Sequence, residues 1–165
     1  MTVLSDSSPL ITLAEIGLLD LLPKLYETVM ITPQVYAEVV VGGAGLAGSS
    51  QISMAGWIDV NPVQNPADLA AAQQRYGLGA GELSVIVLAL ELKADILLID
   101  DRDARKVARQ QGLFVLGCIG ILHEAFDRSL LSDLREAYRA LLASGAYIHP
   151  TLLENILKAR NLQSL

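Results

Sequence analysis

The sequence contains only one cysteine, Cys118, among its 165 residues. A lone cysteine excludes an intramolecular disulfide and leaves no cysteine cluster for a zinc site. Basic residues are also scarce, because 12 lysines and arginines face 18 aspartates and glutamates, for a net charge of −6. This balance argues against a protein that grips nucleic acid through bulk positive charge. It is compatible with an enzyme that gathers acidic side chains around a metal ion.

We expect neither a signal peptide nor a membrane span in this sequence. Its first ten residues include an acid and no basic residue, unlike a secretory leader. The longest uncharged stretch, residues 39–58, is about 20 residues long, enough to cross a bilayer. Its five glycines, three serines and Gln51 instead favour a loop between ordered segments. We therefore predict a cytoplasmic protein with no membrane partner, in a reducing compartment that suits its single thiol.

What the sequence has in abundance is apolar residues, at 52% of the chain, which excludes disorder. Short β-branched or apolar segments alternate with helical patterns. The predicted strands are residues 3–4, 28–32, 57–61, 95–99 and 113–116. The predicted helices are residues 10–22, 33–41, 66–75, 82–92, 102–110, 119–128, 132–143 and 151–159. This alternation predicts an α/β fold in one domain, residues 1–165, with a parallel sheet covered on both faces by helices.

Aspartates follow two of the predicted strands, where open parallel sheets bind their ligands, and two glutamates lie in predicted helices. The candidates are Asp6, Glu38, Glu82, Asp100, Asp101 and Asp103. Two carboxylates about 4 Å apart repel each other by roughly 4 kcal/mol at an effective dielectric of 20, so a cluster needs compensation. All-oxygen ligation suits Mg²⁺ or Mn²⁺ rather than zinc. The sequence therefore predicts a divalent-metal site of the kind that cleaves phosphodiesters.

Four segments resemble the motifs of PIN-domain nucleases. Residues 5–10 (SDSSPL) resemble the opening motif, an aspartate followed by a small hydroxyl residue, and residues 33–39 (PQVYAEV) resemble the second, a proline-started helix with a glutamate. Residues 97–103 (LLIDDRD) resemble the last acidic motif. Residues 79–82 (GAGE) resemble the signature of an uncharacterised bacterial and archaeal branch. The common motif has aspartate where this chain has Glu82, whose extra methylene alters the metal geometry.

The resemblance implies a PIN-like three-layer α/β/α sandwich with a central, mostly parallel sheet. It further implies a metal-dependent ribonuclease that uses Mg²⁺ or Mn²⁺, often the toxin of a toxin–antitoxin pair, with a small antitoxin protein as partner and a homodimer as its assembly. The catalytic residues carried over are Asp6, Glu38, Glu82 and Asp101. The metal ligands carried over are Asp6, Glu82, Asp100, Asp101 and Asp103, with Asp100 and Asp101 competing for one role. Ser7 would orient Asp6 or a bound water.

A basic stripe begins beside the last acidic motif. It consists of Arg102, Arg105, Lys106 and Arg109, whose spacings of three and four direct them towards one helix face. The stripe could bind RNA phosphates. It could equally be an ordinary solvated helix face.

Each candidate also has a structural interpretation. Asp6 could cap a helix, Glu38 could lie on a solvated helix face, and Glu82 could be a first-turn acid that pairs with the helix dipole. One of the neighbours Asp100 and Asp101 could be a cap and the other a ligand. Cys118 and Trp57 are expected in the core.

Two other functions compete with a nuclease. The first is a PIN-like module that is weakly active or inactive and binds nucleic acid or a partner. The second is a phosphotransfer protein, suggested by the adjacent Asp100 and Asp101. In receivers, however, the acidic pair follows the first strand, and here the pair comes late in the chain.

Overall fold

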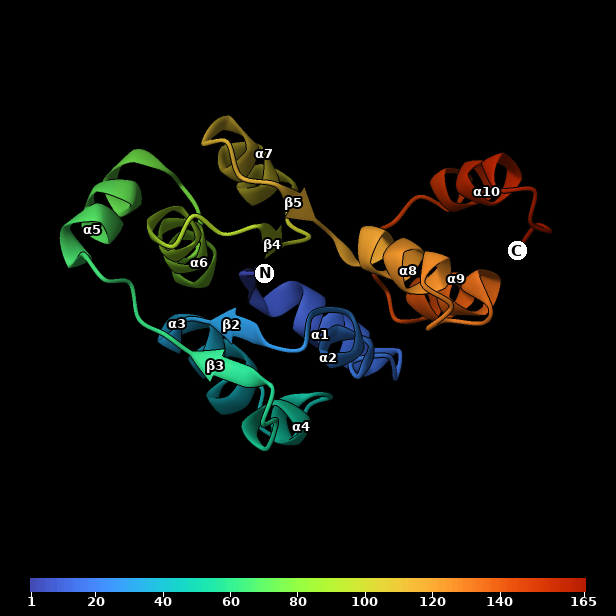
Figure 1. Ribbon diagram of the computed structural model, residues 1–165, viewed down its shortest axis with the longest axis horizontal. Helices are drawn as coiled ribbons and strands as arrows, with labels where there is room; N and C mark the ends of the chain where they lie inside the picture. Colours follow the sequence, from blue (N-terminus) through green and yellow to red (C-terminus); the bar gives the residue numbers. More distant parts are fainter.

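A computed structural model describes residues 1–165, and its centre is a five-stranded sheet (Figure 1). The strands are β1 (Val3–Ser5), β2 (Val29–Ile31), β3 (Ile58–Val60), β4 (Ile96–Leu98) and β5 (Val115–Leu116). They lie in the order β3-β2-β1-β4-β5, and every neighbouring pair is parallel. The predicted α/β class is therefore confirmed, and the sheet expected to be mostly parallel is entirely so.

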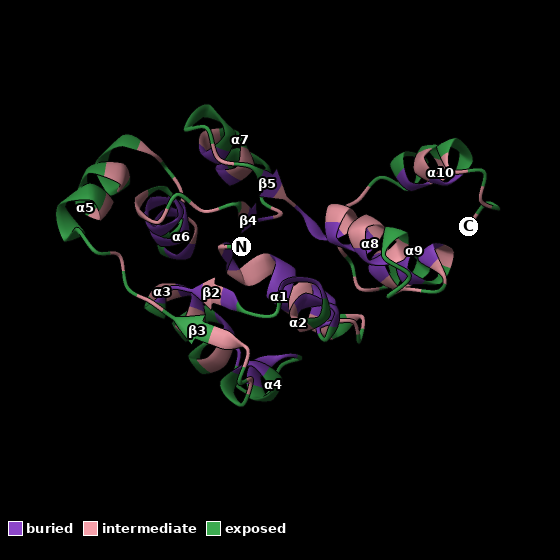
Figure 2. Ribbon diagram, viewed as in Figure 1, coloured by how far each residue is buried: buried purple, intermediate pink, exposed green.

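Ten α-helices and one π-helical turn surround the sheet. They are α1 (Ser7–Glu15), α2 (Leu21–Tyr26), α3 (Pro33–Tyr36), η1 (Ala37–Val41), α4 (Ser49–Ser53), α5 (Pro66–Arg75), α6 (Ala80–Glu91), α7 (Arg102–Gln110), α8 (Cys118–Asp127), α9 (Leu134–Ala143) and α10 (Pro150–Ala159). Helices α5 and α6 lie at one end of the molecule, and α8, α9 and α10 gather at the other (Figure 1). Helix α6 is mostly buried, whereas α5 is mostly exposed (Figure 2).

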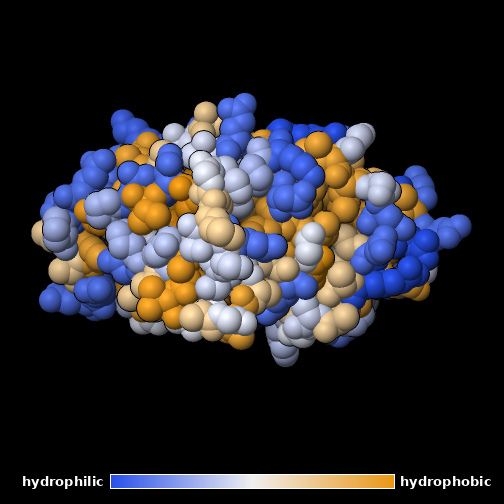
Figure 3. All heavy atoms as spheres, turned by 90° about the horizontal axis from the view of Figure 1, so that it is seen from below, coloured by the Kyte–Doolittle hydropathy of each residue, from blue (hydrophilic) through white to orange (hydrophobic).

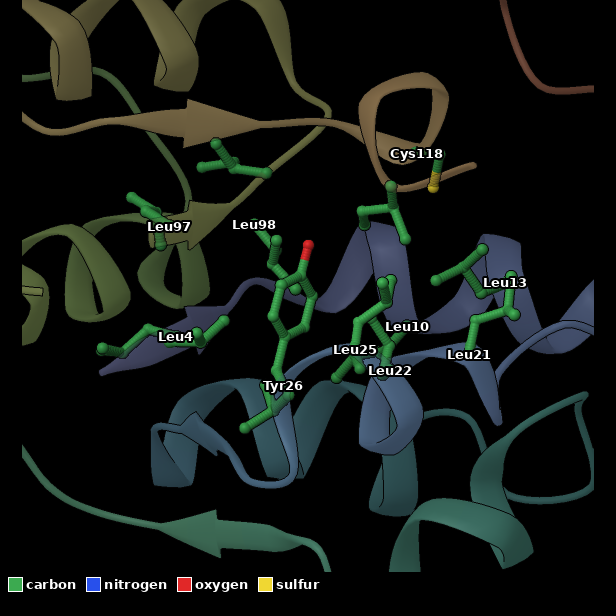
Figure 4. Close-up of a cluster of buried hydrophobic side chains, with 14 of the residues drawn as sticks. Leu4, Leu10, Leu13, Leu21, Leu22, Leu25, Tyr26, Leu97, Leu98 and Cys118 are labelled. Carbon is green, nitrogen blue, oxygen red and sulfur yellow. The ribbon is translucent and has the colours of Figure 1, made fainter. Parts of the chain in front are cut away.

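The core forms where the apolar strands meet the leucine-rich helices α1 and α2. Leu4 of β1 pairs in register with Leu97 of β4, and both side chains are fully buried. Leucines of α1 and α2, among them Leu10 and Leu22, pack beside Tyr26 in the same cluster (Figure 4). Burying each leucine contributes roughly 1.5–3 kcal/mol. This packing fixes β1 and β4 side by side, and with them the acidic residues that follow each strand.

The predicted helix over residues 10–22 is wrong, because the chain forms two helices there. Gly17 adopts a left-handed φ of 72°, which an L side chain rarely tolerates. Its amide donates to the Ala14 carbonyl at 3.1 Å, and the Leu18 amide donates to the Leu13 carbonyl at 2.8 Å. These two bonds make a Schellman motif that ends α1 and turns the chain into α2.

Three further expectations need correction between residues 33 and 58. The helix predicted for residues 33–41 begins as α3 but widens into η1, in which the Gly42 amide donates to the Ala37 carbonyl at 2.7 Å. The loop expected within the glycine- and serine-rich residues 39–58 is interrupted, because α4 spans Ser49–Ser53. Trp57 lies just before β3 and is only half-buried, since β3 is an edge strand with no neighbour on its outer side.

No helix of the structure is both long enough and apolar enough to cross a membrane. Seen from the side on which β3 and α4 lie, the surface mixes hydrophobic and hydrophilic groups (Figure 3). Large apolar side chains that are exposed around α4 include Val41, Leu46 and Met54.

A polar cluster joins α8, α9 and the end of α10. The ring Nε2 of His123 is hydrogen-bonded to the hydroxyl of Tyr138, and Arg160 forms an ion pair with Asp127. Burial lowers the pKa of His123, and the nearby charge of Arg160 lowers it further, against the opposing effect of Asp127. Burial also raises the pKa of Tyr138 to about 12, so the hydrogen bond joins a neutral hydroxyl to a neutral imidazole.

This arrangement predicts a stability that falls in mild acid. When the pKa of a histidine is lower in the folded state, the unfolded chain takes up the proton first as the pH falls. The contribution of His123 to the free energy of unfolding is therefore complete above the ordinary pKa of about 6.5 and is lost as the pH falls below it. We expect His123→Gln, which keeps an acceptor for Tyr138 but cannot titrate, to flatten the change in urea midpoint between pH 7 and pH 5. An equally steep change in this variant would assign the acid sensitivity to other groups.

Candidate active site

The candidate site lies at the carboxyl edge of the sheet, between β1 and β4. Ser5 is in register with Leu98, and the Asp6 amide donates to the Leu98 carbonyl at 2.9 Å. The chain therefore leaves both strands at the same edge, with Asp6 after β1 and Asp100 two residues after β4. This is where ligands bind in open parallel sheets.

Asp6 is the most buried acid of the chain, with 2% of its surface exposed at the N-cap position of α1. Its Oδ2 accepts a hydrogen bond from the Ser8 hydroxyl at 3.1 Å, whereas its buried Oδ1 has no partner. The pKa of Asp6 is raised from the ordinary 3.8 to about 6, mainly by burial and also by the charges of Glu82 and Glu38, while the nearby Ser7 amide and the Ser8 hydroxyl act to lower it. The hydroxyl that supports Asp6 is thus that of Ser8, not the predicted Ser7.

Glu38 and Glu82 each bind a backbone amide near the start of α6. The Gly81 amide donates to Oε1 of Glu38 at 3.2 Å, and the Gly79 amide donates to Oε2 of Glu82 at 2.7 Å. A Cβ on Gly81 would lie 2.5 Å from Glu38 Oε1, so only glycine leaves room for this carboxylate. The π-helical turn η1 carries Glu38, and such turns are frequent at functional sites. Both glutamates therefore use amides at a helix N-terminus, where negative charge is stabilised.

Asp100 is held by the beginning of α8. Its Oδ1 accepts from the Cys118 amide at 2.7 Å, and its Oδ2 accepts from the Cys118 thiol at 3.0 Å. Burial, together with the Asp100 charge, raises the pKa of the Cys118 thiol well above its ordinary range, so the thiol stays protonated and can donate. Cys118 is buried, as predicted for a core cysteine, and it also contacts a carboxylate.

Asp101 and Asp103 are more exposed than Asp6 and Asp100. Oδ1 of Asp101 accepts from the Ala104 amide at 2.8 Å, which makes Asp101 the N-cap of α7. Asp103 lies in the first turn of the same helix. The two neighbours Asp100 and Asp101 thus each bind the N-terminus of a different helix, whereas the sequence suggested one cap and one ligand.

These residues suit a metal ion by the chemical type of their donor atoms. As the side chains stand, no three carboxylate, imidazole or thiol groups lie close enough together to hold one ion. The donors are nonetheless all carboxylates, which suits Mg²⁺ or Mn²⁺. Asp6 offers a buried oxygen without a partner, within the electrostatic reach of Glu38 and Glu82. Glu38 and Glu82 each accept an amide hydrogen bond with one oxygen, which leaves the other oxygen available to a metal ion.

The structure divides the predicted basic stripe. Arg102, Lys106 and Arg109 are exposed and line one polar hollow of about 420 Å³ on α7. Arg105 is half-buried and does not line that hollow, and its Nε is buried without a partner. Its Nη1 lies on the side of Gly117 where Asp100 also lies. The expectation of a single basic face is therefore wrong for Arg105, because its side chain turns inwards towards Gly117 and Asp100.

Sequence reasoning missed two hydroxyl residues next to the site. Thr32 follows β2 and Ser84 lies in α6, and both are fully buried. Thr32 had a local signal, since a threonine before a proline-started helix is a typical N-cap. Ser84 had none, because its partner is 52 residues away in the chain.

The fold and this edge define a class: an α/β protein whose parallel sheet carries a set of acids at its carboxyl edge. The family DUF3368, described as a PIN domain, matches residues 2–161. The chain belongs to this PIN-domain family, whose members are generally nucleases.

Comparison with individual proteins adds little to this assignment. No curated protein matches the chain. Among solved structures, a PilT N-terminus domain protein from the hyperthermophilic archaeon Sulfolobus solfataricus P2 is similar at 17% sequence identity and a TM-score of 0.49. The alignment covers 90% of this chain and 98% of that one.

Proposed function

We propose that this protein is a metal-dependent ribonuclease. The observation that carries the proposal is Asp6, a buried carboxylate with an unpartnered oxygen and a raised pKa, between the charges of Glu38 and Glu82. Burying such a group costs free energy unless a cation compensates it. Three acids at one edge of the fold therefore destabilise the metal-free protein, and a divalent cation would offset this destabilisation.

The acids divide into two kinds in this proposal. Asp6, Glu38 and Glu82 would hold Mg²⁺ or Mn²⁺, with Asp101 reaching the same edge through the oxygen that does not cap α7. Asp100 would act mainly by fixing β5 and α8 at the edge, and Asp103 would add charge. When bound, the metal would supply a Lewis acid that activates water and stabilises the charge of the cleaved phosphodiester.

RNA would reach the edge along α7. Arg102, Lys106 and Arg109 would bind flanking phosphates, and Arg105, beside Asp100, would bind a phosphate closer to the acids. We expect Lys106→Gln to weaken binding of single-stranded RNA in EDTA. The slope of log Kd against log salt should fall by roughly 0.7 for the lost phosphate contact. Lys158→Gln, an exposed change on the distant α10, is the matched control and should leave the slope unchanged.

The proposal includes the toxin role of a toxin–antitoxin pair, with a small antitoxin protein as partner and a homodimer as the assembly. The sequence resemblance to PIN toxins supports the toxin role, the antitoxin partner and the homodimer. Light scattering of the purified chain tests the dimer, because a monomer at tens of micromolar would contradict it. Growth arrest on induced expression tests the toxin role.

Cleavage of a mixed RNA pool in Mn²⁺, in Mg²⁺ and in EDTA tests the ribonuclease itself. We expect cutting with either metal and none in EDTA. Equal cutting in EDTA would contradict metal dependence, and no cutting together with no Mn²⁺ binding by calorimetry would contradict the enzyme.

One observation favours a second candidate, a PIN-like module that binds RNA or a protein without cutting. Glu38 and Glu82 already accept hydrogen bonds from amides, and Glu82 caps its own helix as a purely structural acid would. In a binding module, RNA affinity would persist in EDTA and Mn²⁺ would not bind at millimolar concentration.

A further inference from the structure

Two buried hydroxyl groups connect the segment that carries Glu38 to the helix that carries Glu82. Thr32 and Ser84 both have 0% of their surface exposed, and their oxygens lie 2.7 Å apart. Tyrosines and the cysteine aside, they are two of only five buried polar side chains in the chain. A polar contact in an otherwise apolar interface fixes one register between two helices more strictly than apolar packing does.

The direction of each hydrogen bond in this link follows from the available protons. The Ser84 hydroxyl donates to the Gly81 carbonyl at 2.7 Å, which uses its one proton. The Thr32 hydroxyl must therefore donate to Ser84. The Thr32 oxygen in turn accepts from the Val35 amide at 3.2 Å and so caps α3. Every hydroxyl proton in the link has an acceptor.

The link closes a ring through the candidate site. Thr32 caps α3, which continues into η1 and Glu38, and Ser84 lies two residues after Glu82 in α6. The Gly81 amide returns to Glu38 at 3.2 Å, while the Gly81 carbonyl accepts from Ser84. Gly81 therefore contacts the acid through its N–H and the hydroxyl link through its C=O.

We propose that Thr32 and Ser84 are positioning residues, which hold Glu38 and Glu82 at a fixed separation so that both can reach one metal ion. The proposal rests on the proposed metal-dependent function. Ordinary helix capping would explain the Thr32 bond to Val35. It does not explain a second bond from Thr32 to a buried serine in another helix.

The test compares variants that remove or keep the hydroxyl groups. Thr32→Val and Ser84→Ala remove one each with little change of shape, and Thr32→Ser keeps the hydroxyl. Ser49→Ala is the matched control, because Ser49 is also buried and also donates to a backbone carbonyl, that of Val40 in η1, but takes no part in the link between Thr32 and Ser84. Each variant is examined by Mn²⁺ calorimetry and by the Gly81 amide resonance of the metal-free protein.

We expect Thr32→Val and Ser84→Ala to weaken Mn²⁺ binding by about tenfold, the range seen when supporting groups of metal ligands are lost. Both should shift the Gly81 amide resonance. Thr32→Ser should behave as wild type, and Ser49→Ala should lose stability without losing Mn²⁺ affinity. If Thr32→Val does not fold, Ser84→Ala gives the same comparison.

Wild-type Mn²⁺ affinity in both hydroxyl-free variants would overturn the positioning role. Failure of the proposed function looks different, because the wild-type chain would then bind no Mn²⁺. In that case the Gly81 amide resonance is the deciding measurement. An unchanged resonance in Ser84→Ala would contradict the positioning role of the link. A shifted resonance would support a link that positions Glu38 alone.

Discussion

Replacing Asp6 by asparagine is expected to abolish metal-dependent RNA cleavage and to stabilise the metal-free protein. Asparagine has the same shape and is an equally good N-cap, so α1 should still begin at Ser7. It lacks the negative charge that a metal ion requires. Loss of several kcal/mol of transition-state stabilisation corresponds to a rate at least about 100-fold lower.

The gain in stability follows from the raised pKa of Asp6. A carboxyl group whose pKa is about 6 in the folded protein and 3.8 when unfolded is held in an unfavourable charged form at pH 7. The shift of roughly two units corresponds to about 3 kcal/mol as an upper figure. This penalty is absent below pH 3.8, where the carboxyl is protonated in both states; it grows between pH 3.8 and about 6 and is complete above that. The stabilisation by Asp6→Asn should therefore be largest at neutral pH and vanish near pH 4.

Urea unfolding in EDTA at pH 4 and pH 7 measures the stabilisation by Asp6→Asn, and the RNA assay in Mn²⁺ measures its loss of cleavage. Asp59→Asn, an exposed change on the edge strand β3, serves as the control and should alter neither. Full activity in Asp6→Asn would remove Asp6 from the site. Lower stability at pH 7 would mean that the charge is compensated within the folded chain.

Gly81→Ala is expected to separate function from folding. The new Cβ would lie 2.5 Å and 2.6 Å from the two carboxylate oxygens of Glu38, so this flexible side chain must move. The helix itself should gain, since alanine favours a helix by up to about 1 kcal/mol over glycine. We expect unchanged or higher thermal stability, with Mn²⁺ affinity and cleavage reduced by about tenfold or more.

Gly77→Ala is the matched control, because no atom lies within 4 Å of a Cβ there and Gly77 does not have a positive φ. Calorimetry with Mn²⁺ and a thermal melt of the metal-free protein provide the two readouts. Undiminished Mn²⁺ affinity in Gly81→Ala would show that the observed placement of Glu38 is not the one that binds metal. A large loss of stability would show that the Glu38 side chain cannot yield.

Much of the fold was predictable because its signals are local. The apolar run that forms β4 and the acids that follow β1 and β4 are visible in the sequence, and the rule for parallel sheets brings them to one edge. The end of α1 at Gly17 was missed, because the leucine pattern continues through the turn into α2 and outweighs one glycine. The position of Asp6 at the edge of the sheet was thus predictable from the sequence, whereas its burial was not.

The rest of the site depends on contacts between distant segments. The inward turn of Arg105 follows from the packing of α7 against the edge, which helical spacing alone does not reveal. The second bond from Thr32 joins it to Ser84, 52 residues further on. The hydrogen bonds from Cys118 to Asp100 could not be predicted either, since a buried cysteine in an apolar stretch suggests packing and no hydrogen bond. These features are tertiary, and a single sequence carries no direct signal for them.

The neighbours Asp100 and Asp101 also set where the chain can tolerate insertions. Their two carboxylates fix the first turns of α8 and α7, two helices on either side of β5 in the sequence. An extra residue between them would detach one helix from its anchor. The loop between β3 and α5, residues 61–65, is instead held by one carboxylate, because the amides of Gln64 and Asn65 both donate to Glu91 at the end of α6. Length variation among relatives of this chain should therefore be absent from the Asp100–Asp101 pair.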